Sequence, residues 1–117
     1  MGKLSTHVLD TRQGTPAAGV RIELFSVQDN ERLLLRHTET NADGRCDAPL
    51  LEGPALEKGT YELVFHAGDY FARCNVPLPD PRFVDVVTLR FGIANPAENY
   101  HVPLLVTPWS WSTYRGS

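Results

Sequence analysis

Glycine and proline interrupt this sequence so often that we expect no long helix. Nine glycines and nine prolines are spread over 117 residues, and proline inside a helix lacks a donor and clashes with the preceding turn. The stretches between them are short, and many alternate between apolar and polar residues, the pattern of strands with one wet face. A chain of this length supports one hydrophobic core. The chain therefore predicts an all-β fold with a single domain over residues 1–117.

Seven segments carry the strand pattern. Residues 20–24 and 61–65 alternate between the two faces most clearly. The longest segment, residues 83–93, has apolar residues on both faces and predicts a central strand covered on both sides. The other expected strands are residues 4–9, 33–40, 100–106 and 110–115. Seven or eight strands at this spacing favour an antiparallel β-sandwich.

One short helix is expected at residues 70–74. Asp69 follows Gly68 and can cap its N-terminus. Prolines at 77, 79 and 81 prevent the helix from continuing. Residues 41–44, Asn-Ala-Asp-Gly, predict a tight turn.

Charge and composition exclude several classes of partner. The formal net charge is −3, so no nucleic acid and no anionic membrane surface is expected as a partner. No apolar run approaches the roughly 18 residues of a membrane span, and the first residues lack a signal-peptide pattern. We expect a cytoplasmic protein in which Cys46 and Cys74 stay reduced.

Motifs for common cofactors are missing from the sequence. It has no closely spaced cysteine pair, no phosphate-binding loop and no dinucleotide fingerprint. Residues 41–44 begin like a calcium loop, but the remaining ligands do not follow. No metal and no cofactor is therefore expected.

The four histidines and one arginine are the candidates for chemistry, since histidine titrates near neutral pH. His7 and His101 lie in expected strands, where a histidine is more often a packing residue than a catalyst. His37 lies among charged residues, which is typical of a solvated face, and His66 closes a strand, so neither is expected to carry chemistry. Arg45 follows the turn, and the sequence by itself favours a solvent-exposed side chain there.

The C-terminal segment is unusually aromatic for the end of a chain. Trp109, Trp111 and Tyr114 lie within the last nine residues of the sequence, whereas chain ends tend to fray. Packing on the chain's own sheet and burial in a subunit interface both explain this composition.

Four segments together carry a resemblance to a known family. They are Leu-Ser-Thr-His-Val-Leu-Asp at 4–10, Asn-Ala-Asp-Gly-Arg at 41–45, Tyr-His-Val-Pro-Leu-Leu at 100–105 and Ser-Thr-Tyr-Arg-Gly-Ser at 112–117. In this order they resemble the 5-hydroxyisourate hydrolases, the enzyme branch of the transthyretin-like family. The resemblance spans essentially the whole chain. Its last segment is specific, because the hormone-carrying transthyretins lack it.

The resemblance implies a fold, an assembly and a site. The family's fold is a transthyretin-like antiparallel β-sandwich of two four-stranded sheets with one short helix. Its members are homotetramers, each a dimer of dimers, with active sites in the channel between the dimers. His37 and His66 lie outside the family's site positions. The implied catalytic residues are His7, Arg45 and His101, and the implied substrate-binding residues are His7, Arg45, Tyr114 and Ser117.

The reaction implied by the resemblance is hydrolysis of 5-hydroxyisourate to 2-oxo-4-hydroxy-4-carboxy-5-ureidoimidazoline in urate catabolism. Water adds to the C6 carbonyl, and the bond between N1 and C6 breaks. One of His7 and His101 takes the water proton while the other orients it or assists the leaving nitrogen, and the sequence leaves their roles open. Arg45 supplies a planar fork of donors for carbonyl or oxyanion oxygens.

Two departures and two alternatives remain. Asn99 stands where many family members have histidine, and Ser110-Trp111 replaces the usual Gly-Tyr, which bears on the shape of the channel. One alternative is a transthyretin-like carrier of small aromatic ligands without catalysis. The other is a metal site made by His7 and His101 of several subunits, because paired imidazoles bind zinc readily.

Overall fold

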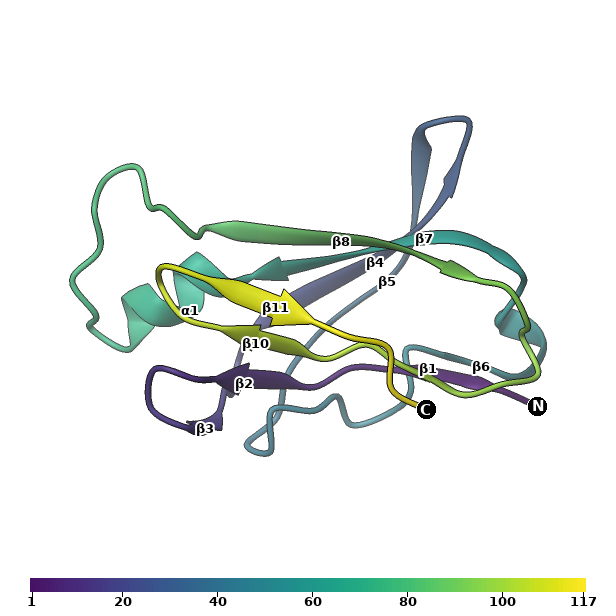
Figure 1. Cartoon of the computed structure of the whole chain (residues 1–117), viewed down its shortest axis with the longest axis horizontal. Coiled ribbons are helices and arrows are strands. Elements are labelled where there is room, and N and C mark those ends of the chain that lie inside the picture. The colour runs from purple at the N-terminus through teal and green to yellow at the C-terminus, as the bar shows by residue number, and fades with distance from the viewer.

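The computed structural model describes all residues, 1–117, as two β layers that face each other (Figure 1). One layer is a sheet with the strand order β5–β4–β7–β8, antiparallel throughout. Its strands are β4 (Arg21–Gln28), β5 (Glu31–Glu39), β7 (Gly59–His66) and β8 (Val86–Ile93). A β-bulge between Leu24 and Phe25 shifts the register of β4 against β5.

The second layer contains the two ends of the chain. Its strands are β1 (Lys3–Ser5), β2 (Val8–Asp10), β3 (Thr15–Pro16), β6 (Leu51–Glu52), β9 (Tyr100–His101), β10 (Leu104–Val106) and β11 (Trp111–Thr113), and the short 3-10 helix η1 (Gly53–Ala55) follows β6. They form a three-stranded sheet, β6–β1–β9, and a four-stranded sheet, β11–β10–β2–β3.

These two sheets form one layer, because the pairing continues across their boundary. The Val102 amide donates to the Ser5 carbonyl over 2.9 Å, and the Leu104 amide donates to the His7 carbonyl over 2.8 Å. β1 pairs with β9 in parallel, as β2 does with β10. The central pairing of this layer therefore joins the first residues of the chain to residues near its end.

The predicted β-sandwich with one short helix is confirmed, with two corrections. Its second layer is not wholly antiparallel, because its central strand pairs run in parallel. The segment expected to be a covered central strand is the edge strand β8, which pairs only with β7. Phe83 precedes β8 and is 73% exposed, and Thr88 and Arg90 are exposed on the outer face of β8. Apolar residues on both faces of this segment therefore do not mean that the strand is covered on both sides, because β8 lies at the open edge of its sheet.

The helix α1 (Ala67–Arg73) follows β7 directly and begins three residues before the predicted start. His66 is the N-cap residue, and no side chain caps the helix there. Asp69 lies in the first turn and accepts a hydrogen bond from Arg82 over 2.8 Å, so its predicted capping role is wrong. The described chain has no helix long and apolar enough to cross a membrane.

The core between the layers is built by alternate residues of the facing strands. It comprises 23 buried hydrophobic residues. Phe65 of β7 is fully buried and lies opposite Ile22 of β4 and Val87 of β8. The largest fully buried side chains are Phe65, Phe71, Leu4, Ile22, Leu24, Leu50, Leu63, Ile93 and Leu104.

Replacing Phe65 by alanine should lower the free energy of unfolding by about 3–5 kcal/mol, because a large cavity would remain among residues that cannot close it. Denaturant unfolding at a fixed protein concentration measures this loss. Phe83→Ala is the matched control, since its ring is 73% exposed, and we expect a change within about 0.5 kcal/mol. Equal losses in the two variants would contradict the location of the core.

Candidate functional site

Three of the predicted site residues lie together on the second layer. His7 lies between β1 and β2, and its backbone forms an isolated antiparallel bridge with Arg45. His101 ends β9, and its ring centroid lies 6.4 Å from that of His7, with the ring planes tilted by 45°. The parallel pairing of Ser5 with His101 produces this proximity. The segments around residues 7, 45 and 101 thus meet at one place.

The His7 ring has a defined tautomer in its neutral form. Its Nε2 lies 3.0 Å from the main-chain carbonyl oxygen of Asp43. A carbonyl oxygen only accepts hydrogen bonds, so Nε2 carries the proton and Nδ1 keeps its lone pair. Burial and the nearby Arg45 cation lower the pKa of His7, although the Asp43 carbonyl partly opposes them. His7 is therefore neutral at pH 7, with Nδ1 able to accept a proton.

The His101 ring is held through its other nitrogen. Its Nδ1 lies 2.9 Å from the Ser5 hydroxyl oxygen. Burial lowers the pKa of His101, and Arg45 and His7 lower it further. Both imidazoles are consequently neutral near pH 7 and expose different nitrogens, Nδ1 of His7 and Nε2 of His101.

The turn before Arg45 is organised by the side chain of Asn41. Its Oδ1 accepts hydrogen bonds from the amides of Asp43 over 2.9 Å and Arg45 over 3.3 Å. Gly44 in this turn has φ +73°, and a Cβ atom there would lie 2.4 Å from the Val8 carbonyl oxygen. The turn therefore fixes both the carbonyl that holds His7 and the start of the Arg45 side chain.

Beside this turn is a polar recess of about 270 Å³. Arg45 and Ser5 lie on its wall, together with Lys3 and Asp47. Arg45 itself is exposed, as the sequence favoured, yet it is close enough to lower the pKa of both histidines. A planar polar molecule placed in this recess would meet the Arg45 guanidinium and the Ser5 hydroxyl, while the two imidazoles lie outside its lining.

The C-terminal tail lies against His101. Two main-chain hydrogen bonds join Gly116 and His101, over 2.7 Å and 3.2 Å. Arg115 anchors the tail, because its guanidinium lies 4.4 Å from the centre of the Tyr100 ring and donates to Glu98 over 2.9 Å and to the Asn99 carbonyl over 3.1 Å. Asn99, a departure from the family pattern, accepts through Oδ1 from the Lys3 amide and makes no side-chain hydrogen bond to either ring of the site.

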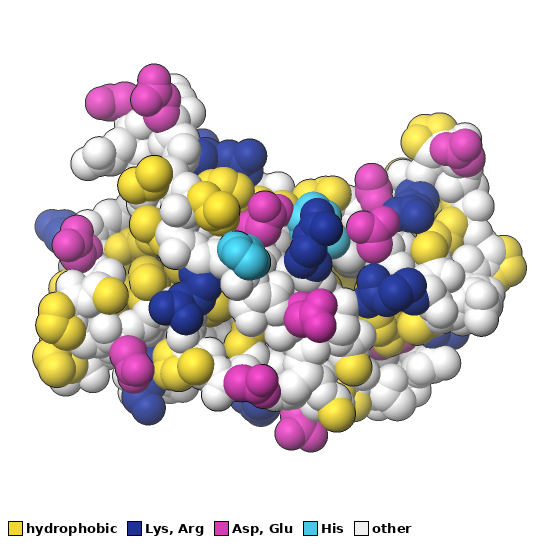
Figure 2. All heavy atoms as spheres, turned by 180° about the vertical axis from the view of Figure 1, so that it is seen from behind, with side chains coloured by type: hydrophobic (Ala, Val, Ile, Leu, Met, Phe, Trp, Pro, Cys, Tyr) yellow, Lys and Arg dark blue, Asp and Glu magenta, His cyan; other side chains and the backbone are white.

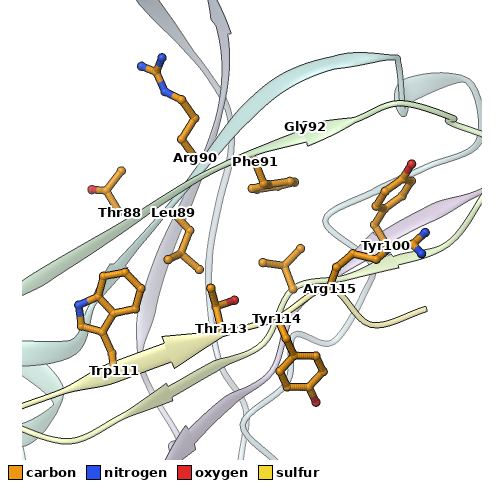
Figure 3. A pocket seen from close by; sticks show the side chains of 11 residues that line it. Thr88, Leu89, Arg90, Phe91, Gly92, Tyr100, Trp111, Thr113, Tyr114 and Arg115 are labelled. Carbon is orange, nitrogen blue, oxygen red and sulfur yellow. The ribbon is translucent and has the colours of Figure 1, made fainter.

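Tyr114 lies on the outer face of the second layer, while its neighbours point inward. Figure 3 shows Trp111 and Thr113 on one side of the C-terminal strand and Tyr114 on the other. Tyr100 is buried, so the next residue, His101, projects from the outer face. Tyr114 therefore shares the outer face with His101. Ser117 follows Gly116 directly and is exposed.

A second cleft lies at the open edge of the sandwich, between β8 and β11. It has a volume of about 450 Å³, and Leu89, Phe91, Tyr100 and Trp111 give it an apolar, aromatic wall (Figure 3). It includes none of His7, Arg45 or His101, but Tyr114 is among its lining residues. Trp111, the second departure from the family pattern, is 45% exposed there.

The other two histidines lie on the opposite layer. Figure 2 shows histidine side chains among acidic and basic ones on the rear face of the molecule. His37 is exposed, as predicted, and is paired in register with Glu23. His66 is only half-buried, and its Nε2 lies 2.7 Å from a Glu23 carboxylate oxygen. Neither residue belongs to the site.

Several contributors to the site escaped the sequence reasoning. The Asp43 carbonyl and the Asn41 side chain act through main-chain geometry, which leaves no trace in residue type beyond a turn motif. Ser5 lies in the first family-like segment and Arg115 in the last, but neither residue type indicates a role there. Both cysteines are free, and burial raises the pKa of the Cys46 thiol.

A sandwich of this topology, with two imidazoles and a guanidinium on one face, defines a transthyretin-like protein with a polar site. The match to known sequences makes the assignment more specific. Residues 4–116 match the model of the HIUase/transthyretin family. The chain belongs to the HIUase/transthyretin family.

Relatives in this family share the whole length of the chain. The 5-hydroxyisourate hydrolase of Ralstonia nicotianae is 60% identical over 117 residues, covering 100% of both chains. The structure of Klebsiella pneumoniae 5-hydroxyisourate hydrolase is 38% identical, covers 100% of both chains and superposes with a TM-score of 0.82.

One similar structure belongs to a longer protein. The crystal structure of (S)-allantoin synthase is 46% identical and superposes with a TM-score of 0.94. The match covers 99% of this chain but only 44% of that one.

Proposed function

We propose that this protein is an enzyme that hydrolyses 5-hydroxyisourate to 2-oxo-4-hydroxy-4-carboxy-5-ureidoimidazoline. The observation that carries the proposal is the meeting of His7, Arg45 and His101 on one face. The relative from R. nicotianae named for this reaction, 60% identical over the full length, supports the same conclusion.

His7 is the general base in the proposed mechanism, because its Nδ1 holds the free lone pair. Nδ1 takes a proton from water as the water oxygen bonds to C6 of the substrate. The bond between C6 and N1 then breaks, and the His7 imidazolium returns the proton to N1. The hydroxyl of water thus ends on C6 and one hydrogen on N1, so the step balances.

Arg45 and His101 stabilise the charge that develops on the C6 oxygen. A guanidinium offers parallel donors to such an oxygen, and a neutral imidazole donates a hydrogen bond without adding a charge. Tyr114 and Ser117 bind the polar ring, which we infer from the location of the tail beside His101.

The test generates 5-hydroxyisourate in place with urate oxidase and follows the decay of its near-ultraviolet absorbance. Clear acceleration at catalytic protein concentrations supports the proposal. No acceleration by a protein shown to be folded would overturn it, and a carrier of small aromatic ligands would then become the leading interpretation.

No metal and no other cofactor takes part in the proposed reaction. The described residues include no group of three or more His, Cys, Asp or Glu side chains suited to hold a metal ion. Full activity in the presence of a chelator would exclude the alternative in which His7 and His101 bind zinc. Loss of activity with the chelator, restored by added metal, would favour it.

The pH dependence follows from the lowered pKa values of His7 and His101. The active form has both rings neutral, so activity is present at neutral pH and is lost as acid protonates them. Because both pKa values lie below the usual value of about 6.5, the acid limb of kcat/KM should have its midpoint below pH 6.5. A pH–rate profile measures it, and a midpoint above 7 would contradict the proposed environment.

A homotetramer built as a dimer of dimers is the proposed assembly. β8 and β11 are edge strands of the two facing sheets, and the aromatic cleft lies between them. Unpaired edges of this kind invite pairing with another chain. Light scattering on the protein eluted from a size-exclusion column should give the mass of four chains, whereas the mass of one chain would contradict the assembly.

The proposed location is the cytoplasm, which cell fractionation would test.

A further inference from the structure

We propose that Ser5 is a positioning residue that holds the His101 ring as a hydrogen-bond donor, an inference that rests on the proposed hydrolase function. The Ser5 hydroxyl oxygen lies 2.9 Å from Nδ1 of His101. The two residues are partners in the parallel pairing of β1 with β9, so their side chains lie next to each other on one face. Strand pairing thus places the serine where it contacts the ring.

The direction of the hydrogen bond follows from the charge of the ring. Burial and the neighbouring Arg45 cation keep His101 neutral near pH 7, so the ring has one N–H group and one lone pair. When the Ser5 hydroxyl donates to the lone pair at Nδ1, both groups are satisfied and the ring hydrogen lies on Nε2. If Nδ1–H of His101 donated to the Ser5 oxygen instead, the hydroxyl hydrogen of Ser5 would still need another acceptor.

The main chain and the serine together immobilise His101. Two hydrogen bonds to Gly116 hold its backbone, which leaves rotation of the ring as the remaining freedom. The bond to Ser5 removes that freedom, since a flipped ring would lose it. Nε2–H of His101 is then the only ring group left for substrate.

The two imidazoles consequently present opposite functions to the substrate. The Asp43 carbonyl leaves His7 with a lone pair at Nδ1, and the Ser5 hydroxyl leaves His101 with a donor at Nε2. The pKa values of both histidines are lowered, yet one carbonyl and one hydroxyl give the two rings different roles. Thr6, the residue between Ser5 and His7 in the sequence, is buried and donates to the Val102 carbonyl, so it stabilises the strand pair instead.

The experiment compares Ser5→Ala with Ser5→Thr, which keeps a hydroxyl. Ser26→Ala is the matched control, because Ser26 is a half-buried strand serine of the other layer. Nitrogen-15 NMR of labelled histidine reads the protonation of each ring nitrogen, with the His101 signals identified by their loss in His101→Gln. Activity is measured on 5-hydroxyisourate generated with urate oxidase.

In the parent protein we expect protonated Nε2 and an unprotonated, hydrogen-bonded Nδ1 in His101. Ser5→Ala should shift the Nδ1 resonance and lower kcat by about 10-fold with a smaller change in KM, since one hydrogen bond to the ring is lost. Ser5→Thr should restore both the resonance and kcat, and Ser26→Ala should change neither.

A protonated Nδ1 in the parent protein would overturn the inference without any variant having to fold. An unchanged kcat in Ser5→Ala, or no recovery in Ser5→Thr, would also overturn it. A parent protein that fails to accelerate decay of the substrate would instead refute the proposed function, and the NMR spectrum would still decide the direction of the Ser5 hydrogen bond.

Discussion

Replacing His7 by alanine should slow hydrolysis of 5-hydroxyisourate by about 10²- to 10⁴-fold, the usual contribution of a general base. The variant loses the Nδ1 lone pair that takes the proton from water. The fold should persist, because the His7 side chain is only half-buried and its backbone carbonyl still accepts from Leu104. Initial rates at saturating substrate, corrected for spontaneous decay, measure the loss.

His37→Ala is the matched control for this variant. His37 is exposed on the other layer, away from the site, so the rate should stay at the parent value. His7→Gln adds a second check, since glutamine can still donate to the Asp43 carbonyl but is not basic. A rate for His7→Gln close to that of the parent would show that His7 orients the turn and does not take the proton.

Replacing Arg45 by methionine should lower kcat by about 10²- to 10³-fold, as expected when a donor to a developing oxyanion is lost. Methionine keeps the apolar stem and removes the charge. The same change should move the acid limb of the pH–rate profile to higher pH, because the Arg45 cation lowers the pKa of both His7 and His101. The pH shift is independent of the oxyanion argument.

Arg36→Met tests whether the effect of Arg45 is specific. Arg36 is an exposed arginine of β5, outside the site, and both its rate and its pH profile should match those of the parent. An Arg45→Met variant with a reduced rate but an unmoved acid limb would show that the guanidinium is farther from the imidazoles than the structure places it.

The strands and the β-sandwich could be predicted from local patterns, but which strands lie next to each other could not. Of the predicted segment 20–24, residues 21–24 form the first half of β4, and residues 61–65 lie within β7. The pattern of residues 83–93 was compatible with a covered strand, and only the arrangement of the other strands makes β8 an edge. Parallel pairing of β1 with β9 likewise depends on segments far apart in sequence, which periodicity does not describe.

The grouping of the site residues came from the resemblance and not from the periodicity. Taken singly, the positions of His7 and His101 in the sequence favour packing residues, and that of Arg45 favours a solvated one. Their proximity depends on strand register and on the Asn41 turn. The hydrogen bonds that distinguish the two histidines involve a backbone carbonyl and a serine, neither of which stands out in a sequence.

The parallel pairing of the two chain ends also sets when the protein becomes active. Ser5 and His101 are 96 residues apart in sequence, so their contact closes a loop of nearly the whole chain, and such contacts form slowly. In refolding, the recovery of activity should therefore follow the burial of the core.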